Sequence, residues 1–349
     1  MVVSFVRLRP NGMVTRGKKR NLIILLAAAL IIAIVLSSFV YLYYQSSING
    51  KQSVSLSIFP NELETPIFVA QDQHFFDENG INLTITHYTS TTDALTSVSN
   101  HNVDITTASD FAFVSNALSQ EKNLTIIASM VKTESSFVVA RKDRGILNPI
   151  DLYGKRVGLT LNIAPEFYFG RFLDLQGLDK QKITIVNLPL AQYVEAITNG
   201  TVDAIVGQQS VVDQIQTQLG NNTVVWPVQN NQPAYILLVS RGDWATQHPD
   251  TVTRFLKSIS QAEDYYLTHQ TSAQAIVEKK LNRTVSQESW LENRFSLSLD
   301  QSLLLAMQDE AQWLISNHLT NATAVPNLIN YLSLDGLTSV KPGAVNIIG

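Results

Sequence analysis

An uncharged run near the N-terminus, from Leu22 to Tyr44, is the feature that most constrains this chain. As a helix its 23 residues would be about 34 Å long, enough to cross a hydrocarbon core of about 30 Å. Cationic flanks of such helices stay cytoplasmic. Six basic residues and no acid precede the run: Arg7, Arg9, Arg16, Lys18, Lys19 and Arg20. We therefore expect a cytoplasmic tail at 1–21, a transmembrane anchor at 22–44 and the binding domain outside the cell membrane.

A cleaved signal peptide is the alternative interpretation of this run. Signal peptides usually have an apolar segment of about 7–15 residues that ends at a small-residue cleavage site. The run found here is longer and ends in tyrosines. An uncleaved, single-pass anchor therefore fits the pattern better.

The composition excludes several classes of site and partner. The chain has no cysteine, which excludes a disulfide framework, thiolate metal sites and a thiol nucleophile. Removing the six N-terminal cations from the 25 basic residues leaves 19, against 29 acidic residues. This negative balance argues against nucleic acid or an anionic membrane surface as a partner. A small anion remains compatible with it, because helix N-termini bind anions locally.

Signals of catalysis are absent from the sequence. It has no Gly-x-Ser-x-Gly, no His-Glu-x-x-His and no phosphate-binding loop, and its six histidines are scattered. We predict no enzyme activity, no metal site and no cofactor. The Asn-X-Ser/Thr triplets are glycosylation candidates, or else ordinary turn residues: Asn82, Asn123, Asn199, Asn221, Asn282 and Asn321.

Beyond a polar linker at 45–53, strand-like and helix-like patterns alternate. Such repeated β-α-β units predict an α/β fold with largely parallel sheets. From Pro249 onward the pattern is mostly helical. The expected strands are 54–59, 81–88, 103–107, 124–131, 136–140, 156–160, 183–188, 202–206, 224–228 and 235–240. The expected helices are 65–79, 92–98, 111–119, 166–175, 192–198 and 211–219.

Two segments about a hundred residues apart resemble each other. Residues 94–109 and 195–208 each read as a helix, an Asn-containing turn, a Val-Asp pair and a strand that ends in small polar residues. We interpret them as parts of two related α/β lobes. In α/β sheets ligands bind at the carboxyl ends of strands, so two facing lobes would place both polar ends on one cleft.

Three motifs in order resemble a known family. TPIFVAQDQHFFDENGINL (65–83), NPIDLYGKRVGLT (148–160) and TNGTVDAIVG (198–207) are similar to segments of nitrate-, sulfonate- and taurine-type substrate-binding proteins of ABC transporters. Relatives of that family bind pyrimidine precursors of thiamine. The resemblance covers roughly residues 54–280.

The resemblance implies a two-lobe, class II periplasmic-binding-protein architecture. Lobe 1 would comprise 54–140 and 236–349, and lobe 2 would comprise 141–235, with crossings near 139–141 and 235–240. It implies a monomeric receptor that delivers a small ligand, of the sulfonate, nitrate or taurine kind, to an ABC permease and its ATPase. An ectodomain for sensing or adhesion, without a transport role, is the alternative.

Candidate ligand residues lie at predicted strand ends, where hydroxyls and amides meet free backbone N–H groups of helix N-termini. They are Ser90, Thr91, Thr92, Ser109, Asp110 and Thr133 in the first lobe, and Asn162 and Gln208 in the second. For each of them a capping or turn role is the alternative. Glu64, Glu166 and Tyr168 are interpreted as surface or packing residues.

Overall fold

The computed structural model describes residues 50–88, 91–119, 123–291 and 293–348, with Ile32, Ile34 and 36–38, but not the side chains of Thr91, Thr92, Glu288 and Ser289. The predicted anchor at 22–44 therefore lies almost wholly outside the described residues. Within the described residues, no helix has the length and apolar character needed to span a membrane. The chain divides into two compact units, 1–51 and 52–349, and the second contains the fold.

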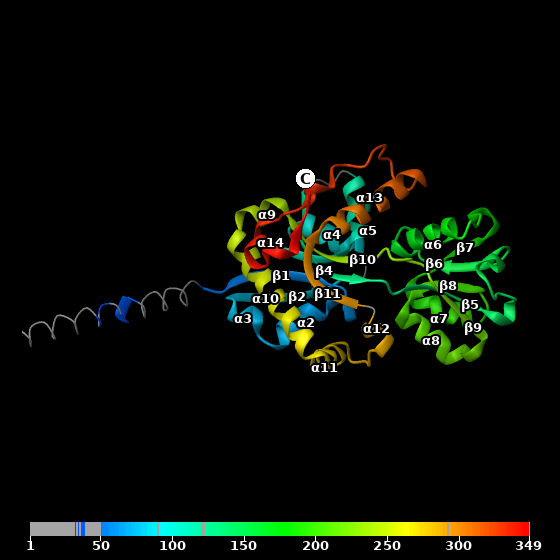
Figure 1. Cartoon of the computed structure of the whole chain (residues 1–349), viewed down its shortest axis with the longest axis horizontal. Coiled ribbons are helices and arrows are strands. Elements are labelled where there is room, and N and C mark those ends of the chain that lie inside the picture. Colours follow the sequence, from blue (N-terminus) through cyan, green and yellow to red (C-terminus); the bar gives the residue numbers. More distant parts are fainter. Residues whose placement is uncertain are drawn as a thin grey trace, which may run out of the picture. The chain divides into compact units, whose positions relative to one another are not determined.

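Two β-sheets organise residues 52–349, each covered by helices (Figure 1). The larger lobe is built on a seven-stranded sheet of order β12-β11-β4-β10-β3-β1-β2, and the smaller lobe on a five-stranded sheet of order β7-β6-β8-β5-β9. The larger sheet contains β1 (Gln52–Ile58), β2 (Ile81–His87), β3 (Ile105–Ser109), β4 (Leu124–Thr133), β10 (Ala234–Arg241), β11 (Asn293–Asp300) and β12 (Val345–Asn346). The smaller sheet contains β5 (Ser136–Arg141), β6 (Arg156–Leu159), β7 (Thr184–Asn187), β8 (Ala204–Gln208) and β9 (Thr223–Pro227).

Helices connect the strands and cover the sheets. Those of the larger lobe are α2 (Thr65–Asp72), α3 (Phe75–Glu78), α4 (Thr91–Ser99), α5 (Asp110–Leu118), α9 (Gly242–Gln247), α10 (Pro249–Thr268), α11 (Gln270–Leu281), α12 (Gln287–Leu291), α13 (Gln301–Ser316) and α14 (Asp335–Val340). Those of the smaller lobe are α6 (Ala164–Leu175), α7 (Tyr193–Thr198) and α8 (Gln209–Leu219).

The two sheets repeat one arrangement, which confirms the interpretation of related lobes. Four strands run in the order β2-β1-β3-β10 in one sheet and β7-β6-β8-β5 in the other, and the last strand of each set is antiparallel. The Val-Asp pairs occupy matching places. The Asp104 carboxylate accepts the Ser55 N–H at 2.9 Å, and the Asp203 carboxylate accepts the Arg156 N–H at 3.0 Å. Each aspartate, which lies just before its own strand, thus joins the start of that strand to the neighbouring parallel strand.

Several local predictions were wrong. The expected helix at 65–79 is interrupted, because His74 has a left-handed backbone (φ 62°) and separates α2 from α3. The C-terminal region, expected to be mostly helical, also contains β11, an eight-residue strand that was not predicted. Both sheets are mixed rather than largely parallel, since β10 runs antiparallel to β3 and β4 and β5 runs antiparallel to β8 and β9.

The chain changes sheet earlier than the predicted crossings. β4 ends at Thr133 and β5 starts at Ser136, and β5 pairs with β8 from its first residue onward. The return falls between Pro227 and Ala234. Residues 136–140 therefore belong to the smaller sheet and 234–235 to the larger one, because hydrogen-bond register rather than apolar pattern decides sheet membership.

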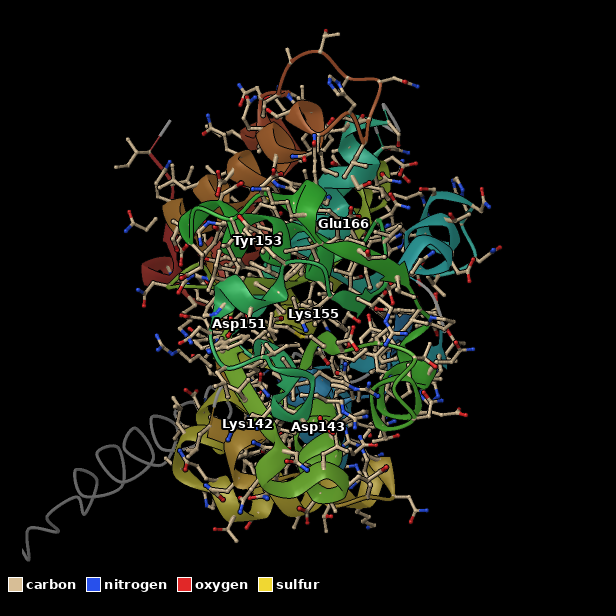
Figure 2. The ribbon with its side chains drawn as sticks, turned by 90° about the vertical axis from the view of Figure 1, so that its right-hand side faces the viewer. Lys142, Asp143, Asp151, Tyr153, Lys155 and Glu166 are labelled. Carbon is tan, nitrogen blue, oxygen red and sulfur yellow. The ribbon has the colours of Figure 1, made fainter. Side chains whose placement is uncertain are left out.

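The motif at 148–160 shapes the outer end of the smaller lobe (Figure 2). The Asp151 carboxylate accepts the N–H groups of Leu147 and Asn148, at 3.0 and 2.8 Å. The Tyr153 hydroxyl accepts the N–H of Asp179 at 3.0 Å, and the Lys155 ammonium donates to a backbone carbonyl at 2.7 Å. Asp151, Tyr153 and Lys155 of this motif therefore have structural roles.

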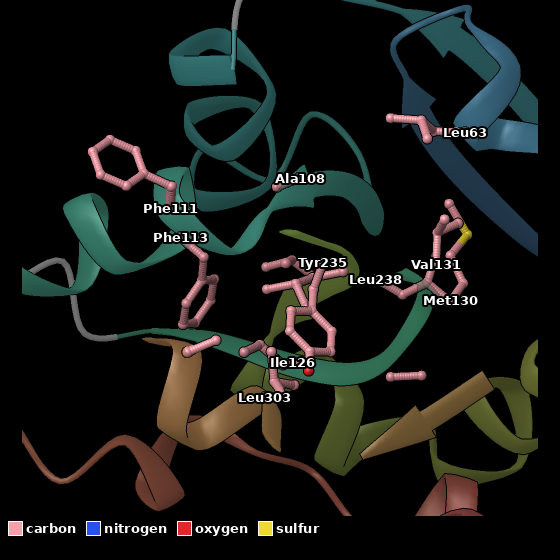
Figure 3. Close-up of a cluster of buried hydrophobic side chains, with 14 of the residues drawn as sticks. Leu63, Ala108, Phe111, Phe113, Ile126, Met130, Val131, Tyr235, Leu238 and Leu303 are labelled. Atoms are coloured by element: carbon pink, nitrogen blue, oxygen red, sulfur yellow. The ribbon is translucent and has the colours of Figure 1, made fainter. Parts of the chain in front are cut away.

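Apolar packing joins the layers of the larger lobe. One buried cluster includes residues of α5, of the sheet and of α13: Phe111 and Phe113, Ile126 and Tyr235, and Leu303 (Figure 3). These side chains are almost fully buried. The same cluster continues through α6, so the two lobes share part of one core.

The Asp104 link predicts a measurable loss of stability. Asp104→Ala should lower the free energy of unfolding by about 1–3 kcal/mol, because the Ser55 N–H loses its carboxylate partner. Asp264→Ala, at an exposed position of α10, should change it by less than about 0.5 kcal/mol. Urea unfolding of both variants checks this, and equal losses would contradict the role given to Asp104.

Candidate ligand site between the lobes

The carboxyl ends of the parallel strands lie beside the crossings between the lobes. Ser109, the last residue of β3, pairs with Ile236 near the start of β10. Gln208, the last residue of β8, pairs with Ser136 at the start of β5. Since β5 and β10 begin at the crossings, the carboxyl edges of both sheets meet there. This is the edge at which α/β proteins bind ligands.

A cavity of about 530 Å³ lies on this junction and is lined by both lobes. The larger lobe contributes α4, α5 and the segment 319–322, and the smaller lobe contributes the start of α6. Two residues predicted from the sequence, Ser109 and Asn162, line it together. Its other polar lining residues are Thr96, Ser115, Asn116, Ser119, Thr320 and Asn321.

Ser109 both caps a helix and lines the cavity. Its Oγ accepts the N–H of Ala112 at 3.2 Å, which satisfies one of the unpaired donors at the start of α5. The hydroxyl proton is not used by that bond and can still be donated. The capping interpretation and a ligand role are therefore compatible at this residue.

Asn162 is held by the first turn of α6. Its backbone is left-handed (φ 63°), a conformation that asparagine tolerates, and its N–H donates to the Glu166 Oε2 at 2.8 Å. Glu166 is buried rather than on the surface, and the Lys180 ammonium lies 3.5 Å from its other oxygen. The loop that carries Asn162 is thereby fixed in place.

The lining favours a small anion over a cation. The N-terminal ends of α5 and α6, one from each lobe, reach the cavity and carry partial positive charge, and the C-terminal end of α5 also lines it, at Leu118 and Ser119. Hydroxyls and amides supply further donors, while Lys, Arg, Asp and Glu are absent from the described lining. Such a site can bind an oxyanion through N–H and O–H donors.

The structure places the other predicted residues elsewhere or does not describe them. Ser90 lies outside the described residues, and Thr91 and Thr92 begin α4 with side chains that are not described. Gln208 is exposed just before α8. Their ligand roles stay predictions.

Asp110 and Thr133 are buried in the larger lobe. The Asp110 carboxylate accepts the N–H groups of Phe111 and Tyr235, at 2.9 and 3.1 Å, so it joins α5 to β10. The Thr133 hydroxyl donates to Ser135 at 3.0 Å, and Thr133 lines a second cavity of about 300 Å³ near the crossings. For both residues the structure shows an internal bond, and a ligand role stays a prediction.

Glu64, interpreted from the sequence as a surface or packing residue, has buried surroundings that the sequence did not single out. It precedes α2 and is buried, not exposed; Thr107 donates to its Oε1 at 2.6 Å, and its Oε2 has no hydrogen-bond partner among the described residues. Burial raises its pKa to about 8, and the Thr107 bond offsets this only in part. The Tyr88 hydroxyl donates to the Thr107 carbonyl nearby, at 2.9 Å. An acid that is largely neutral near pH 7 therefore sits beside β3, just before the segment 65–79 that was expected to be helical.

All six glycosylation candidates are exposed. They are Asn82, Asn123, Asn199, Asn221, Asn282 and Asn321. Exposure is necessary for modification, and use of these sites stays a prediction.

Comparisons with known proteins agree on family and fold. The model of the NMT1/THI5-like family matches residues 61–273. A Haemophilus influenzae protein named for thiamine biosynthesis is 24% identical over 248 residues, which cover 69% of this chain and 78% of that protein.

Solved structures of sulfonate-binding proteins have the same fold. The periplasmic aliphatic sulphonate-binding protein SsuA of Escherichia coli superposes with a TM-score of 0.67 at 14% identity, over 80% of this chain and 97% of that one. The alkanesulfonate-binding SsuA of Xanthomonas axonopodis, bound to MOPS, gives 0.67 at 13% identity, over 82% and 99%. The chain thus has the α/β periplasmic-binding-protein fold.

Glu64 predicts a specific pH dependence of stability. Its pKa is higher in the folded protein than the ordinary 4.5, so its contribution is complete below pH 4.5 and is lost as the pH rises through about 8. Glu64→Gln should remove this pH dependence. Between pH 4.5 and about 8, the free energy of unfolding of the variant should rise relative to that of wild type by up to about 1.4 kcal/mol per pH unit.

Urea unfolding at a series of pH values measures this difference. Glu78→Gln, at an exposed position of α3, is the matched control and should run parallel to wild type. Parallel curves for Glu64→Gln and wild type would mean that Glu64 is ionised in the folded protein.

Proposed function

The chain belongs to the NMT1/THI5-like family, and from this premise we propose that it is a receptor that binds a small oxyanion, of the sulfonate class, between its two lobes. It would pass this solute to an ABC permease and its ATPase. The fold supports a binding role, because several of the structures it resembles are binding proteins for sulfonates.

One observation carries the proposal. Ser109 from the larger lobe and Asn162 from the smaller lobe line the same cavity, each beside a helix N-terminus. A ligand held by both would draw the lobes together, which is how two-lobed receptors close. The neutral, donor-rich lining suits a sulfonate better than an amine or a metal ion.

The location is part of the same proposal. The uncharged run at 22–44 and the cationic residues before it support a single-pass anchor, with the binding domain on the outer side of the cell membrane. A tethered receptor of this kind stays close to its permease without a soluble periplasmic pool.

Removing the two lining groups should weaken solute binding. Ser109→Gly removes the hydroxyl while glycine keeps most of the capping stability, and Asn162→Gly removes the amide while glycine accepts φ 63°. Each variant should lose about 5- to 150-fold in affinity, because a buried ligand oxygen is left without a donor at a cost of about 1–3 kcal/mol. Calorimetry with taurine, methanesulfonate, MOPS and nitrate measures it.

Ser339→Ala removes an exposed hydroxyl on α14 and is the control, expected to bind as wild type does. Binding of none of the four solutes by wild type would refute the proposed ligand class. Binding that both glycine variants leave unchanged would instead place the site elsewhere in the molecule.

The anchor predicts the outcome of protease treatment. In right-side-out vesicles, added protease should digest the chain beyond residue 50 and leave a small membrane-bound fragment that contains Leu22–Tyr44. Tags at the N-terminus and the C-terminus of the chain distinguish the membrane-bound fragment from the undigested protein. A binding domain that survives in intact vesicles but is digested after detergent is added would overturn the proposed topology.

A further inference from the structure

Three polar side chains from both lobes are buried together at the lobe contact. Glu310 of α13 and Asp110 of α5 belong to the larger lobe, and Tyr168 of α6 belongs to the smaller lobe. Glu310 and Asp110 are 0% exposed and Tyr168 is 1% exposed. Neither Glu310 oxygen has a hydrogen-bond partner among the described residues. The Tyr168 hydroxyl lies near the Gln229 side chain without a hydrogen bond of normal geometry.

An aromatic contact between the lobes encloses this cluster. Phe167 of α6 lies 5.9 Å from Phe111 and 5.5 Å from Trp313, measured between ring centroids. Gly170 is in such close contact with Trp313 that a Cβ would come within 2.9 Å of the indole ring. Because these rings belong to opposite lobes, the cluster stays dry only while the lobes are together.

Within the part of the chain that the structure describes, no cation pairs with Asp110 or Glu310. The titratable groups near Glu310 are Asp110 on α5, Tyr168 on α6, Tyr235 on β10 and Asp309 on its own helix. Two cations lie further out: Arg171 on α6, beside Asp309, and Lys132 on β4, whose ammonium is 2.6 Å from Asp300 and 5.3 Å from the centre of the Tyr235 ring. The guanidinium of Arg171 is used elsewhere: its Nη1 donates to the Gln229 carbonyl at 3.0 Å, and its Nε lies 3.8 Å from the Asp309 carboxylate. Among the described residues Glu310 has no ion pair.

A carboxylate in such surroundings takes up a proton. Burial, and next the nearby Asp110 charge, raise the pKa of Glu310 well above its ordinary value, and burial raises the pKa of Asp110 to about 7. The two acids titrate together because each disfavours the charge of the other. Burial, followed by the Asp110 and Glu310 charges, likewise raises the pKa of Tyr168, which therefore stays neutral.

We propose that Asp110, Glu310 and Tyr168 form a proton-operated clasp, which holds the lobes together while the two acids carry protons and lets them separate when a proton is lost. Separation of α6 from α13 returns Glu310 to water, where its charge is no longer costly. The clasp would regulate the ligand site of the proposed function. It rests on that proposed function in one respect only, namely that the two lobes open and close. Its effect on the lobes does not require a solute.

The direction of the pH effect follows from linkage. The closed form binds more protons than the open form, since its acids have the higher pKa values. The protonated acids therefore favour closure fully when the pH is below the ordinary pKa values of carboxyl groups. This preference for the closed form is lost as the pH rises through about 7. A solute would be held more tightly on the acidic side and released more readily on the alkaline side.

The distance between the lobes tests the clasp directly. The chain has no cysteine, so Gln176→Cys and Ser316→Cys provide two unique exposed sites, one on each lobe, for a fluorescent pair. Energy transfer in the full-length chain in detergent micelles, without added solute, should fall between about pH 5 and pH 8. One linked proton changes the closed-to-open ratio by at most about tenfold per pH unit.

Glu310→Gln has the same shape and cannot ionise, so its energy transfer should change less with pH than that of wild type, with only the contribution of Asp110 left. Glu310→Met, a second variant of similar volume, is used if the glutamine variant folds poorly, and the same weaker pH dependence is expected. Glu195→Gln, at an exposed position on α7, is the control and should follow wild type. A wild-type profile that does not change with pH, or a Glu310 variant that follows wild type, would overturn the clasp. The calorimetric test of solute binding is independent of either result.

Discussion

The buried side chain of Gln229 ties together the two segments that cross between the lobes. Its Oε1 accepts the Ser136 N–H and its Nε2 donates to the Thr133 carbonyl, both at 2.9 Å. These bonds fix the spacing of β4, β5 and the return segment at 228–233. Because β5 and β10 start here and lie beside β8 and β3, the carboxyl edges of both sheets are forced to meet. The cavity, the helix N-termini around it and the lobe contact all depend on this junction.

Around that junction the molecule buries acids instead of exposing them. Glu64, Asp110 and Glu310 lie within packed layers, and each is close to a strand end or a helix of the larger lobe. Because burying a charge without a cation costs free energy, protonation of these acids is the state of lowest free energy. Acids of this kind make the junction sensitive to pH, while the cavity beside it is lined by neutral donors. Ligand recognition and lobe closure can therefore be governed by separate groups.

Much of the fold could be predicted from the sequence, because alternating apolar patterns and turn residues report local structure. The paired Val-Asp segments indicated two related lobes, and hydrogen bonds of Asp104 and Asp203 show the physical reason for them. Ser109 and Asn162 could be chosen because each follows a strand and precedes a helix. The break in the helix at His74 could not be predicted, because the apolar pattern continues through this residue and only its left-handed backbone interrupts the helix.

Sequence alone determined the uncharged N-terminal run, the absence of thiol chemistry, the order of most strands and helices, and the strand-end positions of the candidate ligand residues. These are properties of composition and local pattern. Tertiary structure decided which of those residues share a cavity, where the chain changes sheet, and which acids are buried. Nothing in the local sequence around Glu64 or Glu310 marks these acids as buried, and only the packing of distant segments around them removes their water. Desolvation is a property of the whole fold, and no local pattern encodes it.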